Sequence, residues 1–173
     1  MNYATIKEHD TANGNGVRVS LFVSGCTHHC KECFNSEAWD FNFGKPYTED
    51  VEDEILKLLG RPYIRGLSLL GGEPMEVVNQ PSIAKLVVRA KQMYPTKDIW
   101  CYSGYLFDKD ILSKDGRVHT QYTDQILQNI DVMVDGEFVV ALKNLKLKFR
   151  GSSNQRLIDV KQSLSLGKVV SFE

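Results

Sequence analysis

The sequence predicts an α/β fold with a mostly parallel sheet, arranged as a partial, open β/α barrel. Apolar stretches of strand length alternate with amphipathic stretches of helix length, and this order is typical of βαβ units. Four strand ends carry Gly-rich or polar turns, the positions where parallel α/β folds bind ligands. The barrel is expected to be incomplete because the chain has 173 residues, whereas a full eight-stranded barrel takes ~250.

The first strand and the first helix have clear local signals. Residues 17–23 are rich in β-branched and aromatic side chains and end at Ser24-Gly25, as expected of a strand followed by a turn. A helix is predicted from Thr48 to Leu59, because acidic residues fill its first turn and apolar residues form one face. Gly60 is expected to end it.

The alternation continues through the middle of the chain. Residues 66–70 form a short apolar run that ends at Gly71-Gly72, which predicts a strand buried on both faces. A helix is predicted over residues 81–93, with its apolar side chains on one side. Residues 99–102 are then expected to form a third strand, which ends at Ser103-Gly104.

The next elements are shorter. A helix is predicted over residues 123–130, and a strand over 132–134 that ends at Asp135-Gly136. Apolar and basic residues alternate over 145–150, which predicts a half-buried strand with a basic outer face. That face either meets an acidic partner or is simply solvated, and it carries Lys143, Lys146, Lys148 and Arg150.

The end of the chain has a weaker pattern. A short apolar run at Leu157-Ile158 is followed by residues with little periodicity. We therefore expect one domain over residues 1–158 and a loosely held C-terminal tail over residues 159–173. The polar segment 151–155 is expected to be a loop, either for docking or facing a ligand.

Composition narrows the class of protein. Hydrophobic residues make up 42% and charged residues 25%, as in ordinary globular proteins and unlike disordered chains. With 21 Lys and Arg against 22 Asp and Glu, the net charge is −1, so neither nucleic acid nor an anionic membrane is an expected partner. The sequence shows no secretory signal and no apolar run long enough to span a bilayer. We therefore expect a cytoplasmic protein.

The cysteines are the main chemical signal. Cys26, Cys30 and Cys33 follow the first predicted strand with the spacing C-x3-C-x2-C, and such a cluster in a reducing compartment is typical of a metal or redox site. Thiolates on a short loop suit a four-iron cluster, in which three ligands leave one iron open to another molecule. Cys101 lies in an apolar strand and is expected to be a buried side chain rather than a fourth ligand.

A structural zinc site is the alternative interpretation of these cysteines. His9, His28 or His29 would complete it. Zinc sites usually have two ligand pairs, and this sequence has only one C-x2-C pair and no second group downstream. The iron–sulfur interpretation is therefore favoured.

Several segments together resemble one family. The cysteine spacing is similar to that of the radical S-adenosylmethionine (SAM) enzymes, and over residues 1–158 the chain resembles the family that activates the anaerobic ribonucleoside-triphosphate reductase. The segments that carry the resemblance are Asn13–Cys26, Cys33–Asn35, Gly66–Pro74, Asp98–Trp100 with Gly104-Tyr105, Asp131–Gly136 and Phe149–Gln155. This chain departs from the family's common pattern at Asn15, often Pro, and at Glu32, commonly Gly.

The resemblance implies a radical SAM oxidoreductase that is an iron–sulfur activase. Cys26, Cys30 and Cys33 would hold a [4Fe–4S] cluster whose open iron binds SAM. Cleavage of SAM would give a 5′-deoxyadenosyl radical. This radical would generate a glycyl radical on the large subunit of the anaerobic (class III) ribonucleotide reductase. A flavodoxin-like protein is the expected electron donor. The residues expected to contact SAM are Glu32, Cys33, Phe34, Gly71, Gly72 and Glu73, with Ser103, Met133 and Asp135 as further candidates at later strand ends.

Two alternatives stay open from the sequence. The chain is also compatible with another small radical SAM enzyme, of the pyruvate formate-lyase activase type or the 7-deazaguanine synthase type. From a different class, it is compatible with a non-catalytic metal-binding module for electron transfer. The first alternative is distinguished by the molecule acted upon, and the second by the absence of SAM cleavage.

Overall fold

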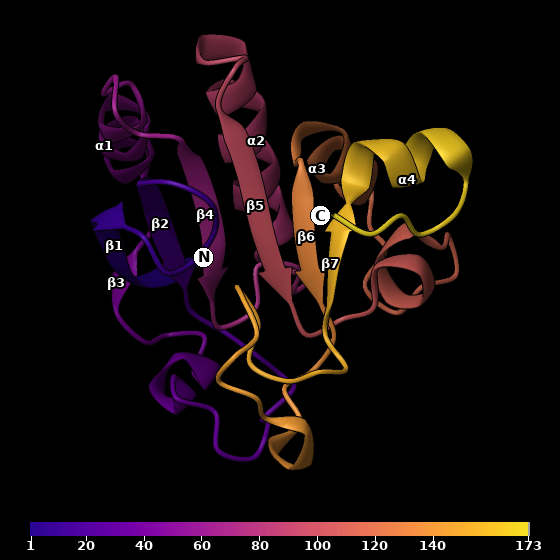
Figure 1. Cartoon of the computed structure of the whole chain (residues 1–173). Helices are drawn as coiled ribbons and strands as arrows, with labels where there is room; N and C mark the ends of the chain where they lie inside the picture. The colour runs from indigo at the N-terminus through magenta and orange to yellow at the C-terminus, as the bar shows by residue number, and fades with distance from the viewer. Residues whose placement is uncertain (173) are drawn as a thin grey trace.

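The computed structural model describes residues 1–172 and has one open, seven-stranded sheet in the order β3-β1-β2-β4-β5-β6-β7. The four central strands run parallel, and the pairings at both edges are antiparallel. The predicted mostly parallel, open α/β fold is thus confirmed in outline (Figure 1). The strands are β1 Asn2–Asp10, β2 Arg18–Val23, β3 Lys45–Pro46, β4 Gly66–Gly71, β5 Asp98–Ser103, β6 Val132–Asp135 and β7 Arg156–Asp159.

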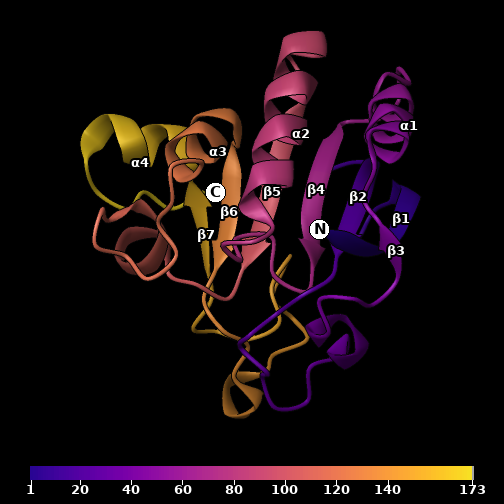
Figure 2. The ribbon, with the colours of Figure 1, turned by 180° about the vertical axis from the view of Figure 1, so that it is seen from behind.

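The helices lie mainly on one face of the sheet. Figure 2 shows α1, α2 and α3 in front of the strands when the molecule is seen from behind, whereas α4 lies at the edge beyond β7. Their bounds are α1 Glu49–Leu59, α2 Gln80–Met93, α3 Thr123–Asn129 and α4 Val160–Leu166. Thr48 caps α1 by accepting a hydrogen bond from the Val51 N–H, and Gly60 follows its last turn, as predicted. Among residues 1–172, no helix has both the length and the apolar character needed to cross a bilayer.

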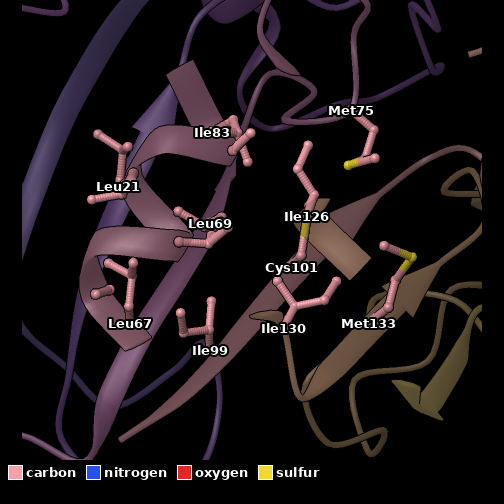
Figure 3. Packing of buried hydrophobic residues seen from close by; sticks show 14 of the residues in the cluster. Leu21, Leu67, Leu69, Met75, Ile83, Ile99, Cys101, Ile126, Ile130 and Met133 are labelled. Atoms are coloured by element: carbon pink, nitrogen blue, oxygen red, sulfur yellow. The ribbon is translucent and has the colours of Figure 1, made fainter. Parts of the chain in front are cut away.

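The main core lies between the sheet and these helices (Figure 3). In β4, Leu67 and Leu69 point into this core, whereas Ser68 between them belongs to the opposite face. That face is also covered, because Trp100 of β5 packs edge-to-face against Phe149 and Phe172, with ring centroids 5.1 and 5.4 Å apart. The strands are therefore buried on both sides, as predicted for β4.

Two predictions about the C-terminal third are wrong. Residues 145–150 form no strand, and the Leu145 side chain is 90% exposed. The edge of β6 that this segment would have paired with is occupied by β7 instead. The C-terminal segment is not loosely held: it forms α4, Ser171 bridges to Ile158, and Phe172 packs on Trp100.

The parallel strands place one set of loops together. The carboxyl ends of β2, β4, β5 and β6 face the same rim, and Figures 1 and 2 show residues 24–44 and residues 136–155 lying side by side beyond it. We call residues 26–33 the cysteine loop and residues 142–150 the lysine loop.

Candidate functional site

A cavity of about 560 Å³ opens at this rim, between the cysteine loop, the ends of β4 and β5, and the segment that follows β6. Most of the predicted site residues line it. These are Cys26, Cys30, Glu32, Cys33, Phe34, Gly71, Gly72, Glu73 and Ser103. The structure thus brings together residues from three strand ends that are far apart in the sequence.

Each of the three cysteines follows a residue with a positive φ angle. The angle is 96° at Gly25, 50° at His29 and 57° at Glu32. Since L-residues rarely adopt this region, the repeated turn is a specific way of winding the loop so that all three thiols face one cavity. The conformation at Glu32 is one that glycine adopts without strain.

The thiols are partly withdrawn from water. Burial raises the pKa of Cys26 to about 12, against the backbone N–H groups of His28 and His29, which lower it. Burial also raises the pKa of Cys30, while the backbone N–H of Phe138 lowers it. Metal ligands must be deprotonated, so assembly of a cluster has to release the protons of Cys26 and Cys30.

The donor set fits a cluster better than a single ion. Within residues 1–172, no three His, Cys, Asp or Glu side chains converge on one point. In a four-iron cluster each cysteine binds a different iron, so three separated thiols around a cavity are the appropriate arrangement. The histidines of the zinc alternative are engaged elsewhere: His28 bonds two carboxylates, His29 stacks on Trp39 and His9 stacks on Tyr63.

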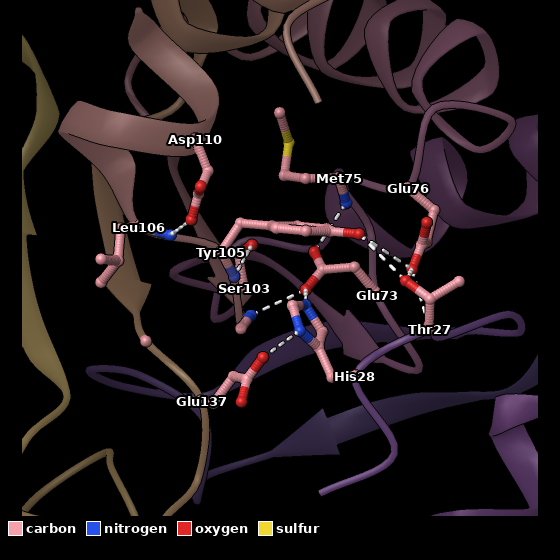
Figure 4. Close-up of polar contacts among 12 residues, drawn as sticks. Thr27, His28, Glu73, Met75, Glu76, Ser103, Tyr105, Leu106, Asp110 and Glu137 are labelled. Atoms are coloured by element: carbon pink, nitrogen blue, oxygen red, sulfur yellow. Dashed lines mark hydrogen bonds and ion pairs between the residues drawn. The ribbon is translucent and has the colours of Figure 1, made fainter. Parts of the chain in front are cut away.

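Two buried carboxylates fasten the cysteine loop to the turn after β4 (Figure 4). Glu76 Oε1 accepts hydrogen bonds from the backbone N–H and the hydroxyl of Thr27, both at 2.7 Å. Glu73 Oε2 lies 3.0 Å from His28 Nε2 and accepts the Gly104 N–H at 2.7 Å, while Glu73 Oε1 accepts the Met75 N–H. Both oxygens of Glu73 are therefore used within the protein, and its carboxylate braces the loops around the cavity.

His28 joins three loops. Its Nδ1 lies 2.8 Å from Glu137 Oε1, after β6, and its Nε2 faces Glu73, after β4. Burial alone would lower the pKa of His28, but hydrogen bonds and charge from Glu73 and Glu137 outweigh it and raise the pKa. The imidazole thus links the cysteine loop to the segments that follow β4 and β6.

The glycines at the strand ends are required by close packing. A Cβ on Gly72 would lie 2.6 Å from the carbonyl oxygen of Gly25, and one on Gly104 would lie 2.6 Å from the His28 ring. Gly71 has a φ of 113°, and a Cβ there would lie 2.6 Å from the Val23 backbone. The Gly-Gly turn therefore lets the end of β4 touch the chain that leads into the cysteine loop.

Two candidates for SAM contact, Asp135 and Met133, lie outside the cavity lining, and so does Cys101, which was expected to be a buried side chain rather than a ligand. Asp135 is fully buried, where its carboxylate binds the Arg156 guanidinium and accepts the Phe107 N–H. Met133 and Cys101 belong to the hydrophobic core. In contrast, Ser103 lines the cavity, and its hydroxyl accepts the Tyr105 N–H at 3.1 Å.

Sequence reasoning missed several residues that surround the cavity. Trp39 Nε1, Tyr102 OH and Arg150 Nε are buried and have no hydrogen-bond partner among the described residues, and all three residues line the cavity. Buried polar atoms are nearly always hydrogen-bonded in proteins, so these atoms are available to a bound molecule. Arg150 lies in a segment that the sequence had singled out, whereas Trp39 carried no local signal.

Comparisons with known proteins give one matching family and several similar relatives. Residues 12–158 match the family described as a 4Fe-4S single cluster domain. The anaerobic ribonucleoside-triphosphate reductase-activating protein of Escherichia coli (strain K12) is 42% identical over 157 residues, which cover 90% of this chain and 96% of that protein. Proteins of the same name from Vibrio cholerae and from Enterobacteria phage T4 are 41% and 40% identical, over 90% and 91% of this chain and 96% and 93% of their own.

Proposed function

This chain belongs to the family of anaerobic ribonucleoside-triphosphate reductase-activating proteins, and from that premise we propose that it is a radical SAM oxidoreductase. Its substrate would be the large subunit of the anaerobic (class III) ribonucleotide reductase, on which it generates a glycyl radical. The observation that carries the proposal is the cavity in which the C-x3-C-x2-C cysteines meet the Gly71-Gly72-Glu73 turn. The open sheet is compatible with the partial barrel expected for radical SAM enzymes.

Cys26, Cys30 and Cys33 would hold the [4Fe–4S] cluster, leaving one iron for SAM. When bound, the reduced cluster supplies the electron that cleaves SAM to methionine and a 5′-deoxyadenosyl radical. Gly71 and Gly72 line the cavity at the end of β4, where their carbonyl groups would accept hydrogen bonds from the SAM ammonium. Glu73 acts as a positioning residue, because it fixes Gly104 and His28 beside the cavity.

Other lining groups suit the remainder of SAM. Glu32 and Phe34 lie beside the last cysteine, and Ser103 lies at the end of β5. The Tyr102 hydroxyl and Arg150 Nε, which have no partner among the described residues, are polar donors that can meet a ligand rich in acceptor atoms. We further propose a cytoplasmic location and a flavodoxin-like electron donor.

The function is tested on anaerobically reconstituted protein reduced with dithionite. A [4Fe–4S]⁺ EPR signal is expected to change shape when SAM is added, and adding the reductase is expected to yield 5′-deoxyadenosine and a glycyl radical on the reductase. Pyruvate formate-lyase and a pterin substrate, offered in parallel, test the other radical SAM activities. Absence of SAM cleavage under all reducing conditions would leave the electron-transfer module as the better explanation.

Glu73→Gln is expected to weaken SAM binding about tenfold, a loss of about 1.4 kcal/mol, while the cluster content stays near that of the wild type. The glutamine amide nitrogen cannot accept a hydrogen bond, so at least one of the donors on Gly104, Met75 and His28 loses its acceptor. The measurement is a SAM titration followed by the cluster EPR signal.

Glu37→Gln is the matched control for this variant. Glu37 lies nearby in a short 3-10 helix, Ser36–Trp39, and is exposed. The same loss of charge there should leave SAM binding unchanged. If Glu73→Gln bound SAM as tightly as the control, Glu73 would have no positioning role.

A further inference from the structure

The lysine loop forms one side of the cavity mouth. Lys143, Asn144, Leu145 and Leu147 line the same cavity as the three cysteines. Leu145 is 90% exposed at this mouth, and Phe34, next to the last cysteine, is 94% exposed. These are the two most exposed large hydrophobic side chains of the described residues, and exposed apolar groups around a site are typical of surfaces that another molecule covers.

The charge of the loop is one-sided. Residues 142–150 contain four basic residues and no acidic one. Lys143, Lys146 and Lys148 are exposed, and their ammonium groups form no ion pair within residues 1–172. The positive charge is therefore open to a partner, and acidic groups complement it.

The loop is held in place although it is not regular secondary structure. The Ser153 N–H donates to the Leu142 carbonyl at 2.9 Å, and the Asn144 N–H donates to the Gly151 carbonyl at 3.1 Å. Gln155 Oε1 accepts the N–H groups of Gly151 and Ser152. The polar segment 151–155 thus anchors the loop, and a preformed surface costs less ordering entropy when a partner binds.

We propose that the lysine loop is the docking surface for the reductase, and that the reductase surface around the entry of the target glycine presents acidic side chains to the lysines and an apolar one to Leu145. The proposal rests on the proposed function and adds its partner surface. A glycine has to enter the cavity itself, and the lysine loop lines that cavity. An electron donor needs only to approach the cluster from outside, so the loop's apolar, cavity-lining side chains favour the reductase.

The test compares two triple charge reversals in cluster-loaded protein. Lys143→Glu, Lys146→Glu and Lys148→Glu together are expected to raise the Kd for the purified reductase about tenfold or more and to reverse the weakening of binding by salt. The control variant carries Lys45→Glu, Lys57→Glu and Lys168→Glu, three exposed lysines without ion pairs in the described part of the chain. It has the same net charge and should bind almost as the wild type does.

A second pair of variants tests the apolar contact. Leu145→Ala is expected to raise the Kd severalfold, whereas Leu166→Ala, which is 60% exposed at the end of α4, should not change it. Cluster content and circular dichroism show whether each variant is folded. Binding of the reductase that is equal in the two charge-reversed variants would overturn the proposal, as would a loss confined to electron transfer from flavodoxin.

The same samples separate this proposal from the function on which it rests. SAM cleavage by dithionite-reduced protein without the reductase should be the same in the wild type and in a Lys146→Glu, Lys148→Glu double variant, because these two lysines do not line the cavity. If the wild type bound the reductase through the lysine loop but formed no glycyl radical, the docking surface would stand and the proposed function would fail.

Discussion

Replacing Cys26, Cys30 or Cys33 singly by alanine is expected to remove the iron–sulfur cluster and all SAM-dependent activity. Three thiols line the cavity, and in a four-iron cluster held by these three ligands the loss of one would leave two irons without a cysteine ligand. The measurements are iron and sulfide per chain and the EPR signal of the reduced protein. Each variant is expected to be EPR-silent and to yield no glycyl radical.

Cys101→Ala is the matched control for these three variants. Its side chain is fully buried in the core, away from the cavity lining. We expect it to keep the cluster and to lower the free energy of unfolding by about 1 kcal/mol, because a small buried group is removed. Full iron content in any one of the three cavity variants, or loss of the cluster in Cys101→Ala, would contradict the assignment of ligands.

The central part of the fold could be predicted because its signals are local. The parallel strands are short apolar runs that end in turns, and the helices between them have one apolar face. β1 was missed, because Asn2–Asp10 is mostly polar and becomes a strand only through its pairing with β2. The alternation over 145–150 was misleading for the converse reason: the pattern suits a strand, but the edge of β6 is already taken by β7.

The candidate site also has features that the local sequence predicts and features that depend on the fold. The cysteine triplet and the Gly-Gly-Glu turn are contiguous motifs, so the sequence alone predicts that they meet at one rim, and both line the cavity. The contact between His28 and Glu137 joins residues 109 positions apart, and no local sequence pattern predicts it. Arg18 was placed in a strand, but its complete burial in an ion pair with Asp98 depends on how the sheet folds over it.

A single methyl group added at the end of β4 is expected to destabilise the protein strongly. Gly71→Ala is expected to lower the free energy of unfolding by at least about 3 kcal/mol. The added Cβ meets the nitrogen and the carbonyl oxygen of Val23, both at 2.6 Å, and the φ of 113° is itself unfavourable for alanine. Backbone atoms cannot move aside as a flexible side chain can, so β2 and β4 have to separate.

Gly167→Ala isolates the conformational part of this effect. Gly167 also has a positive φ, of 65°, but a Cβ there has no atom within 4 Å. Its cost should be about 1 kcal/mol, and its cluster content should be unchanged. Urea unfolding of the reduced, metal-free variants measures both losses, and equal losses would show that contact with Val23 is unimportant. Because Val23 leads directly into the cysteine loop, the strain from Gly71→Ala should also reduce the iron content, and this links strand packing to the site.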